Sequence, residues 1–129
     1  MNYDELVNEA QHRLERPGRG PTVRAIRAVL TALGERLHPD EAKDLASNLP
    51  MEIDRFLLEA ESGQRFSYKD LVSRISEIDK SDPADAAYLA QVVTGFISEV
   101  VPKGELRDVK NSLPDEFEDL FEKTQLARA

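Results

Sequence analysis

The chain has 129 residues, of which 40% are hydrophobic and 33% charged, and its formal net charge is −8. This balance predicts one globular domain over residues 1–129 and excludes a disordered chain. The absence of cysteine excludes disulfides, thiolate nucleophiles and cysteine-based zinc sites. An acidic chain repels phosphate backbones, and no apolar run approaches the roughly 20 residues that span a membrane, so we expect neither nucleic-acid nor membrane binding. The acidic N-terminus does not resemble a signal peptide, which favours a cytoplasmic protein.

Apolar residues recur with helical spacing along the chain and predict eight short helices. In the first half the helices are expected over residues 3–16, 21–37, 40–48 and 50–60. In the second half they are expected over residues 68–79, 83–101, 104–112 and 114–126. The second helix of each half is the most apolar, so this pair should lie at the centre of the core.

Capping signals support several of these helix starts. Asn2 with Glu5, and Ser67 with Asp70, have the spacing of a capping box. Asp82 before a proline is typical of an N-cap that is followed by proline at the first helical position.

The two halves repeat the same phrases in the same order. "NYDELV" at residues 2–7 is matched by "SYKDLV" at residues 67–72, and "SNLPMEI" at residues 47–53 by "NSLPDEF" at residues 111–117. This recurrence predicts an internal duplication: repeat one at residues 2–60, a linker at residues 61–66 and repeat two at residues 67–126. The expected fold is all-α, with two pseudo-symmetric four-helix repeats forming one compact bundle.

The shared Leu-Pro-x-Glu phrase predicts a tight corner between the third and fourth helices of each repeat. The residue before a proline is pushed out of the helical region, so each leucine should end a helix and turn inward. Each proline should then occupy position N1 of the next helix, and each glutamate position N3. The residues are Leu49, Pro50 and Glu52 in the first repeat, and Leu113, Pro114 and Glu116 in the second.

Three longer phrases carry a resemblance to a known family. They are "RAIRAVLTALGERL" (24–37), "DEAKDLASNLPMEI" (40–53) and "KGELRDVKNSLPDEF" (103–117). In this order they resemble a bacterial family known as domain of unknown function 2267, over nearly the whole chain. The resemblance implies an all-helical domain with two repeats, and it implies no activity, because the family has no established catalytic residues to transfer.

Two Glu-x-x-His pairs, Glu9 with His12 and Glu35 with His38, have the spacing found in di-iron helical bundles. A helical wheel places His12 and Glu35 opposite the apolar stripes of their helices, whereas a bundle site needs ligands that project inward. His38 precedes a proline at a helix end, where it is expected to act in capping. We therefore predict no metal site, no cofactor and no catalytic residues.

Arginine is concentrated in one stretch of this acidic chain. Six arginines between residues 13 and 36 are offset by only two glutamates. The arginines are Arg13, Arg16, Arg19, Arg24, Arg27 and Arg36. They could be solvated side chains that the rest of the fold neutralises, or they could form a face that docks an anion or a partner, centred on Arg24 and Arg27, which lie one turn apart.

The sequence thus predicts a non-catalytic protein that acts through an unidentified protein partner, with self-association as a further possibility. A small-ligand or metal-dependent helical enzyme is the alternative.

Overall fold

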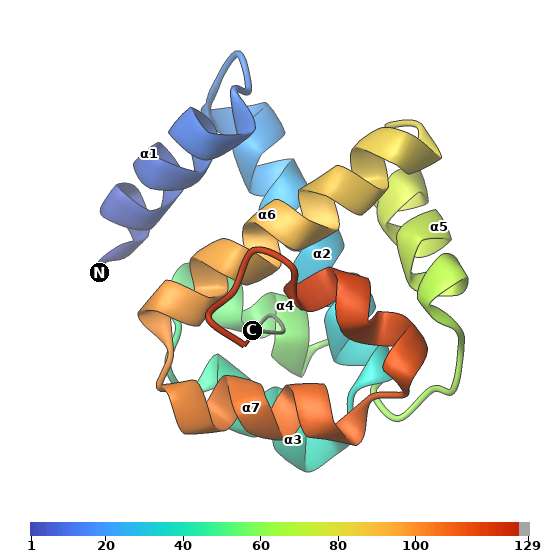
Figure 1. Cartoon of the computed structure of the whole chain (residues 1–129). Helices are drawn as coiled ribbons and strands as arrows, with labels where there is room; N and C mark the ends of the chain where they lie inside the picture. The colour runs from blue at the N-terminus through green and yellow to red at the C-terminus, as the bar shows by residue number, and fades with distance from the viewer. Residues whose placement is uncertain (127–129) are drawn as a thin grey trace.

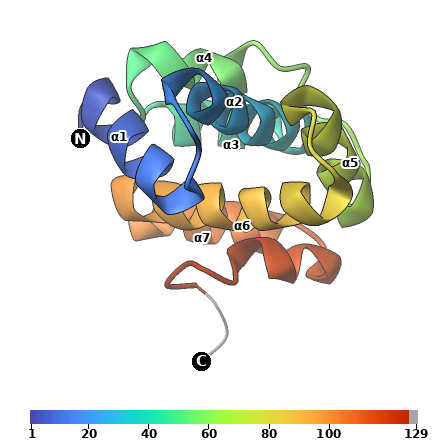
Figure 2. The same ribbon diagram turned by 90° about the horizontal axis from the view of Figure 1, so that it is seen from above.

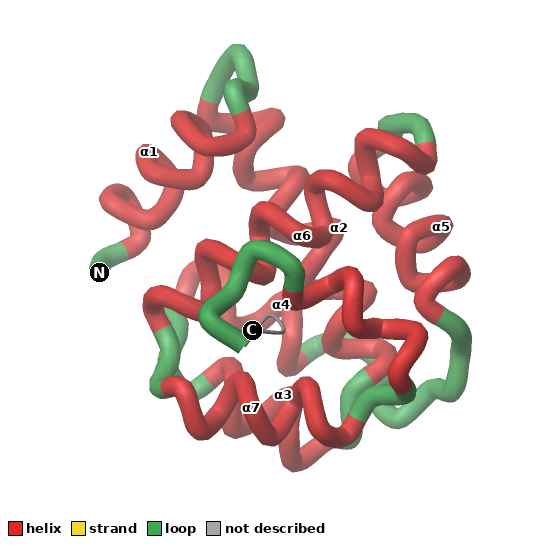
Figure 3. Tube along the Cα trace, viewed as in Figure 1, coloured by secondary structure: helices red, strands yellow, loops and turns green. Residues whose placement is uncertain are grey.

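The computed structural model describes residues 1–126, which form seven α-helices and one 3₁₀-helix. No strand occurs among these residues (Figure 3), so the predicted all-α fold is confirmed. The elements are α1 (Tyr3–Leu14), α2 (Arg19–Arg36), α3 (Pro39–Ala46), α4 (Met51–Leu58), α5 (Tyr68–Asp79), α6 (Pro83–Val100), α7 (Lys103–Ser112) and the 3₁₀-helix η1 (Asp115–Phe121) (Figure 1). Residues 127–129, which the predicted domain includes, lie outside the described residues.

The helices form two layers joined at their ends. Seen from above, α2, α3 and α4 lie in one layer and α6 and α7 in the other, with α1 at one end and α5 at the opposite end (Figure 2). Helix α1 contacts α6, and α5 contacts α2, so the first helix of each half reaches across to the other half. The two halves therefore share one core.

The core is centred on α2 and α6, as predicted. These two helices contact each other, and α2 also packs against α1, α4 and α5, while α6 packs against α1, α5 and η1. Nine residues are buried in each of the two helices. Because α2 and α6 meet neighbours on most sides, their sequences are apolar around most of the helix rather than along one stripe.

Helix lengths are similar in the two halves. Helices α1 and α5 have 12 residues each, and α2 and α6 have 18 each. The third elements have 8 and 10 residues, and the fourth 8 and 7. These lengths agree with a duplicated unit, but the repeat bounds and the pseudo-symmetry stay predictions from the sequence.

The predicted helix caps are confirmed. Asn2 Oδ1 accepts the Glu5 N–H at 2.9 Å, and the Glu5 carboxylate accepts the Asn2 N–H at 3.2 Å. The corresponding box of Ser67 and Asp70 has distances of 3.1 and 3.4 Å. Asp82 caps α6 by accepting an N–H at 2.9 Å. These bonds satisfy donors that the first helical turn leaves without partners.

The predicted burial of the leucine in each Leu-Pro corner is confirmed, but the predicted helix position of the proline is wrong. Leu49 and Leu113 are each 8% exposed and belong to the core. Pro50 and Pro114, however, are N-cap residues rather than N1, because their ψ angles of 145° and 159° are extended. The glutamate of each phrase therefore stands at N2, not N3.

The fourth element of the second half is a 3₁₀-helix that ends at residue 121, rather than an α-helix extending to residue 126. Like charges one turn apart on an α-helix, such as Asp115 with Asp119 and Glu118 with Glu122, oppose the α form. Glu116 also serves another helix, since its Oε1 accepts the N–H of Tyr68, the first residue of α5, at 2.7 Å. Sequence spacing could not show this contact between residues 48 positions apart.

Two glycines allow chain segments to cross the central helices closely. A Cβ at Gly34 of α2 would lie 3.0 Å from the Leu57 carbonyl oxygen, and a Cβ at Gly95 of α6 would lie 2.8 Å from the Lys123 carbonyl oxygen. The segment after η1 therefore packs directly on α6, crossing in front of it in Figure 1.

The linker at residues 61–66 is bonded to the C-terminal end of α2. The N–H groups of Gly63 and Gln64 donate to the carbonyls of Leu37 and Glu35, at 2.8 and 2.9 Å. Arg36 Nε donates to the Phe66 carbonyl at 2.8 Å. The linker thus supplies donors to carbonyls that the end of a helix leaves unpaired.

Candidate functional site

Most arginines of the basic stretch pair with carboxylates from other helices. Arg13 of α1 donates a bidentate pair of hydrogen bonds to the Glu99 carboxylate of α6, both at 2.8 Å. Its Nε donates to Glu9 at 2.9 Å. The hydrogen bonds to Glu99 raise the pKa of Arg13, and the bond to Arg13 lowers the pKa of Glu99. Arg19 pairs with Asp4 at the surface. Much of the local positive charge is therefore neutralised within the fold.

The most buried charge in this region is Asp79, at the end of α5, which is 1% exposed. Arg16 donates two hydrogen bonds to the Asp79 carboxylate, at 2.8 and 3.1 Å. Arg24 Nε lies 3.5 Å from Asp79 Oδ1, an oxygen that Arg16 Nη1 also contacts. A buried carboxylate is strongly destabilising unless it is paired, so these arginines are part of what allows Asp79 to be buried.

Asp79 was not identified from the sequence, although a signal exists. Asp79 extends the i, i+4 series of Leu71 and Ile75, both of which are buried. A carboxylate on the apolar face of a helix requires a cation, and the neighbouring arginine stretch supplies it.

A cleft of about 440 Å³ opens beside this ion pair. It lies between the turn joining α1 to α2 and the turn joining α5 to α6, which form the two upper tips in Figure 1. We call it the inter-hairpin cleft. Its lining includes Arg16, Arg24, Asp79, Lys80, Ser81 and Tyr88.

Two features distinguish the lining of the inter-hairpin cleft. Tyr88 of α6 is 53% exposed, which is unusual for a large aromatic side chain. The hydroxyl of Ser81 and Nε of Arg24 are buried atoms without a hydrogen-bond partner in the described part of the chain. Tyrosine and arginine are also the residue types most enriched in the energetic centres of protein interfaces.

The two predicted site residues occupy different environments. Arg24 lines the cleft, and its side chain is 42% exposed. Arg27, one turn further along α2, is exposed and makes no ion pair within residues 1–126. Arg24 thus has an internal role beside Asp79, whereas Arg27 has none that the described contacts reveal.

Three of the four residues in the Glu-x-x-His pairs have separate partners, and no side-chain hydrogen bond of His12 occurs within residues 1–126. Glu9 bonds Arg13, and Glu35 bonds Arg74 at 3.1 Å. His38 caps α3, as its Nδ1 accepts the N–H of Asp40 at 3.2 Å, which agrees with the predicted capping role. Residues 1–126 contain no group of three or more potential ligands that could hold a metal ion.

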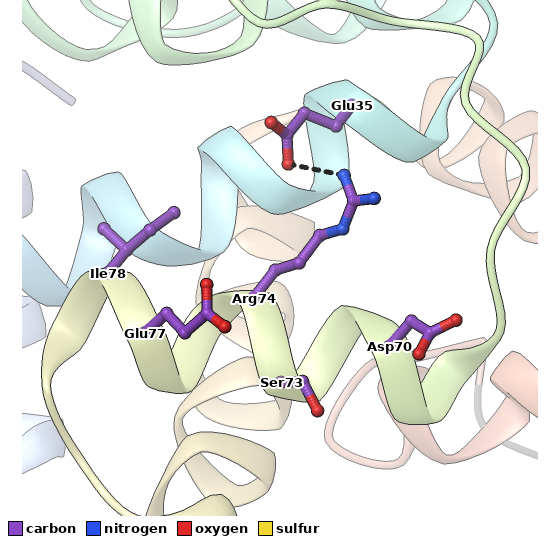
Figure 4. A pocket seen from close by; sticks show the side chains of 6 residues that line it. All are labelled: Glu35, Asp70, Ser73, Arg74, Glu77 and Ile78. Atoms are coloured by element: carbon purple, nitrogen blue, oxygen red, sulfur yellow. Dashed lines mark hydrogen bonds and ion pairs between the residues drawn. The ribbon is translucent and has the colours of Figure 1, made fainter.

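A second surface depression, of about 650 Å³, runs along α5 (Figure 4). Half of its lining residues are acidic, and the lining comprises Glu35, Asp70, Ser73, Arg74, Glu77 and Ile78. Arg74 crosses it to bond Glu35 and also donates to Gln64 of the linker at 2.9 Å. No histidine or lysine lies in this lining to activate the Ser73 hydroxyl as a nucleophile.

Comparison with known proteins identifies a family. A family model described as "Uncharacterized conserved protein (DUF2267)" matches residues 3–120. No curated protein matches the chain significantly. Within residues 1–126, no helix has both the length and the apolar character needed to cross a membrane.

Proposed function

Because the chain belongs to the DUF2267 family, whose description carries no activity, we propose its function from its surface: a non-catalytic protein that binds an acidic protein partner. The proposed docking face comprises Arg24, Arg27 and the neighbouring inter-hairpin cleft. The proposal includes a cytoplasmic location, which rests on the sequence alone.

The observation that carries the proposal is the juxtaposition of cation and aromatic side chain at this cleft. The partly exposed guanidinium of Arg24 lines the same cleft as Tyr88, and Arg27 extends the positive charge along α2. An acidic segment would place carboxylates against these arginines and could accept the unpaired donor of Ser81. Opposite charges would also accelerate association with such a partner.

The carboxylates of the cleft restrict what can dock there. Glu15, Asp79 and Asp85 line the cleft together with the basic residues. Asp79 is already neutralised by Arg16, but the other two would repel an acidic segment placed beside them. The expected partner therefore has a few defined carboxylates rather than a long acidic run.

The test is affinity purification from the native host, followed by a binding measurement with the recovered partner. Arg27→Glu should weaken association and reduce its dependence on salt, and adding Arg24→Gln should weaken it further. Glutamine is chosen at position 24 because glutamate would face Asp79. The control is Lys103→Glu with Arg107→Glu, an exposed pair on α7. Equal loss of binding in the control, or no loss in the Arg27 variant, would contradict the docking face.

The enzyme alternative has no observation in its favour within residues 1–126. His38, Glu41 and Ser112 line one small pocket, but the Ser112 hydroxyl donates to the Val109 carbonyl at 2.8 Å and His38 Nδ1 accepts the N–H of Asp40. No group of three or more potential metal ligands occurs among the described residues.

A further inference from the structure

A separate small pocket lies at the opposite end of α2 from the inter-hairpin cleft. Its volume is about 160 Å³. It is bordered by the last turn of α2, the start of α3, the linker and the end of α7, and the residues of interest in its lining are Arg36, His38, Glu41, Gly63 and Arg65. This pocket does not depend on the proposed docking face.

Two arginines of this pocket make no ion pair within residues 1–126, although Glu41 also belongs to the lining. Within the described residues, neither Arg36 nor Arg65 makes an ion pair, although the chain has 25 acidic residues and only 17 basic ones. Burial, and then the charge of Arg65, lower the pKa of Arg36, and the Glu116 carboxylate opposes this lowering only in part. Adjacent like charges disfavour each other's charged forms, and a bound anion would relieve this repulsion.

Arg36 is held by neighbouring structure, whereas the Arg65 side chain is exposed. Arg36 Nε donates to the Phe66 carbonyl, and its guanidinium lies 5.0 Å from the centre of the Phe117 ring. Arg65 follows two linker residues, Gly63 and Gln64, whose N–H groups are bonded to the end of α2. Groups that are already positioned lose less entropy when a ligand binds.

The chemistry of the lining indicates a small oxyanion. Guanidinium groups bind phosphate through paired N–H donors. His38 Nδ1 accepts a hydrogen bond, so the proton of the neutral ring is on Nε2, which is a further potential donor. Glu41 contributes one opposing charge, which limits the site to a single anionic group. The volume equals that of about five water molecules, enough for a phosphate group and little more.

We propose that the pocket between Arg36, Arg65 and His38 binds a phosphate-class oxyanion, either free or as the terminal group of a monoester. The probe is inorganic phosphate, titrated calorimetrically into the full chain at an ionic strength held constant with chloride. Saturable binding of one phosphate per chain is expected. Absence of saturable binding would overturn the proposal.

Three variants tie the binding to this pocket. Arg65→Gln should weaken phosphate binding by about tenfold or more, the effect of losing one charged hydrogen-bonding group. Glu41→Gln should tighten it, because it removes the opposing charge. Arg107→Gln, which removes an exposed arginine of α7 outside the pocket lining, should leave it unchanged. Equal affinity in the Arg65 variant and the wild type would overturn the assignment.

Further ligands distinguish the source of the oxyanion. Phenyl phosphate binding as tightly as inorganic phosphate would support a phosphate group attached to a larger molecule. Binding of inorganic phosphate alone would support a free ion. Acetate binding with the affinity of phosphate would refute the phosphate class.

Discussion

The ion pair between Arg16 and Asp79 connects the turn after α1 to the end of α5, and we predict that it stabilises the fold. Replacing Arg16 with methionine keeps much of the apolar stem but removes the two hydrogen bonds, leaving a carboxylate that is 1% exposed. Removing one partner of a fully buried pair costs about 3–5 kcal/mol. Here Arg24 stays 3.5 Å away, and the Arg16 side chain is itself 19% exposed, so we expect a loss of about 2–3 kcal/mol.

The assay is urea unfolding followed by circular dichroism, with a double-mutant cycle. Asp79→Asn should lower the free energy of unfolding by less than Arg16→Met does, because Arg16 and Arg24 can still reach solvent when the carboxylate is removed. The double variant should be more stable than the sum of the single effects by about 1 kcal/mol or more, since the two residues are coupled. Arg19→Met is the matched control, because its ion pair with Asp4 is exposed and should contribute less than about 1 kcal/mol.

Two results would refute this reasoning. If Arg16→Met and Arg19→Met had equal and small effects, the buried pair would not support the fold. If the single effects at Arg16 and Asp79 were simply additive, the contact between them would not be the cause of the loss.

Three further predictions concern individual residues. Tyr68→Phe should change stability at neutral pH by less than about 1 kcal/mol, because the Tyr68 hydroxyl is buried without a hydrogen-bond partner. Burial, and then Asp119, raise the pKa of Tyr68 above its ordinary value of 10.0. The wild-type protein should therefore lose stability as the pH rises above about 10, and the Tyr68→Phe variant should lose less. Parallel curves of stability against pH for the two proteins would contradict this. Gly95→Ala should destabilise the fold by about 1–3 kcal/mol more than Gly104→Ala in thermal unfolding, because only the Cβ at position 95 would meet the segment around Lys123. Equal effects would mean that this segment does not pack on α6 as described. Leu49→Ala and Leu113→Ala should each cost about 2–5 kcal/mol in chemical denaturation, and a cost below about 0.5 kcal/mol in either would argue against a buried corner.

Helix positions could be predicted because their signals are local. Capping residues and apolar spacing act within one or two turns, and they placed α5 at its observed bounds and the other α-helices within about two residues. Apolar spacing does not predict the 3₁₀ form of η1, because this spacing does not include the repulsion among the acidic residues of the segment.

The long-range contacts could not be predicted in the same way. Arg16 and Asp79 are 63 positions apart, and Tyr68 and Glu116 are 48 apart, so their pairing depends on how the halves pack. The charge of the arginine stretch was visible in the sequence, but the sequence does not show which arginines are neutralised. Arg27 and Arg65 are distinguished from Arg13 and Arg16 only by tertiary structure.

The proposal that the Arg24 and Arg27 face docks a protein can be tested most directly by site-specific photo-crosslinking in the native host. A benzophenone side chain replaces Tyr88, an exposed aromatic residue of the inter-hairpin cleft, so that Arg24 and Arg27 stay in place. A second variant carries it at Lys43, an exposed position on α3. The docking face predicts a discrete crosslinked protein from position 88 and none of the same mass from position 43. No crosslinked protein at position 88, or the same products from both positions, would contradict it.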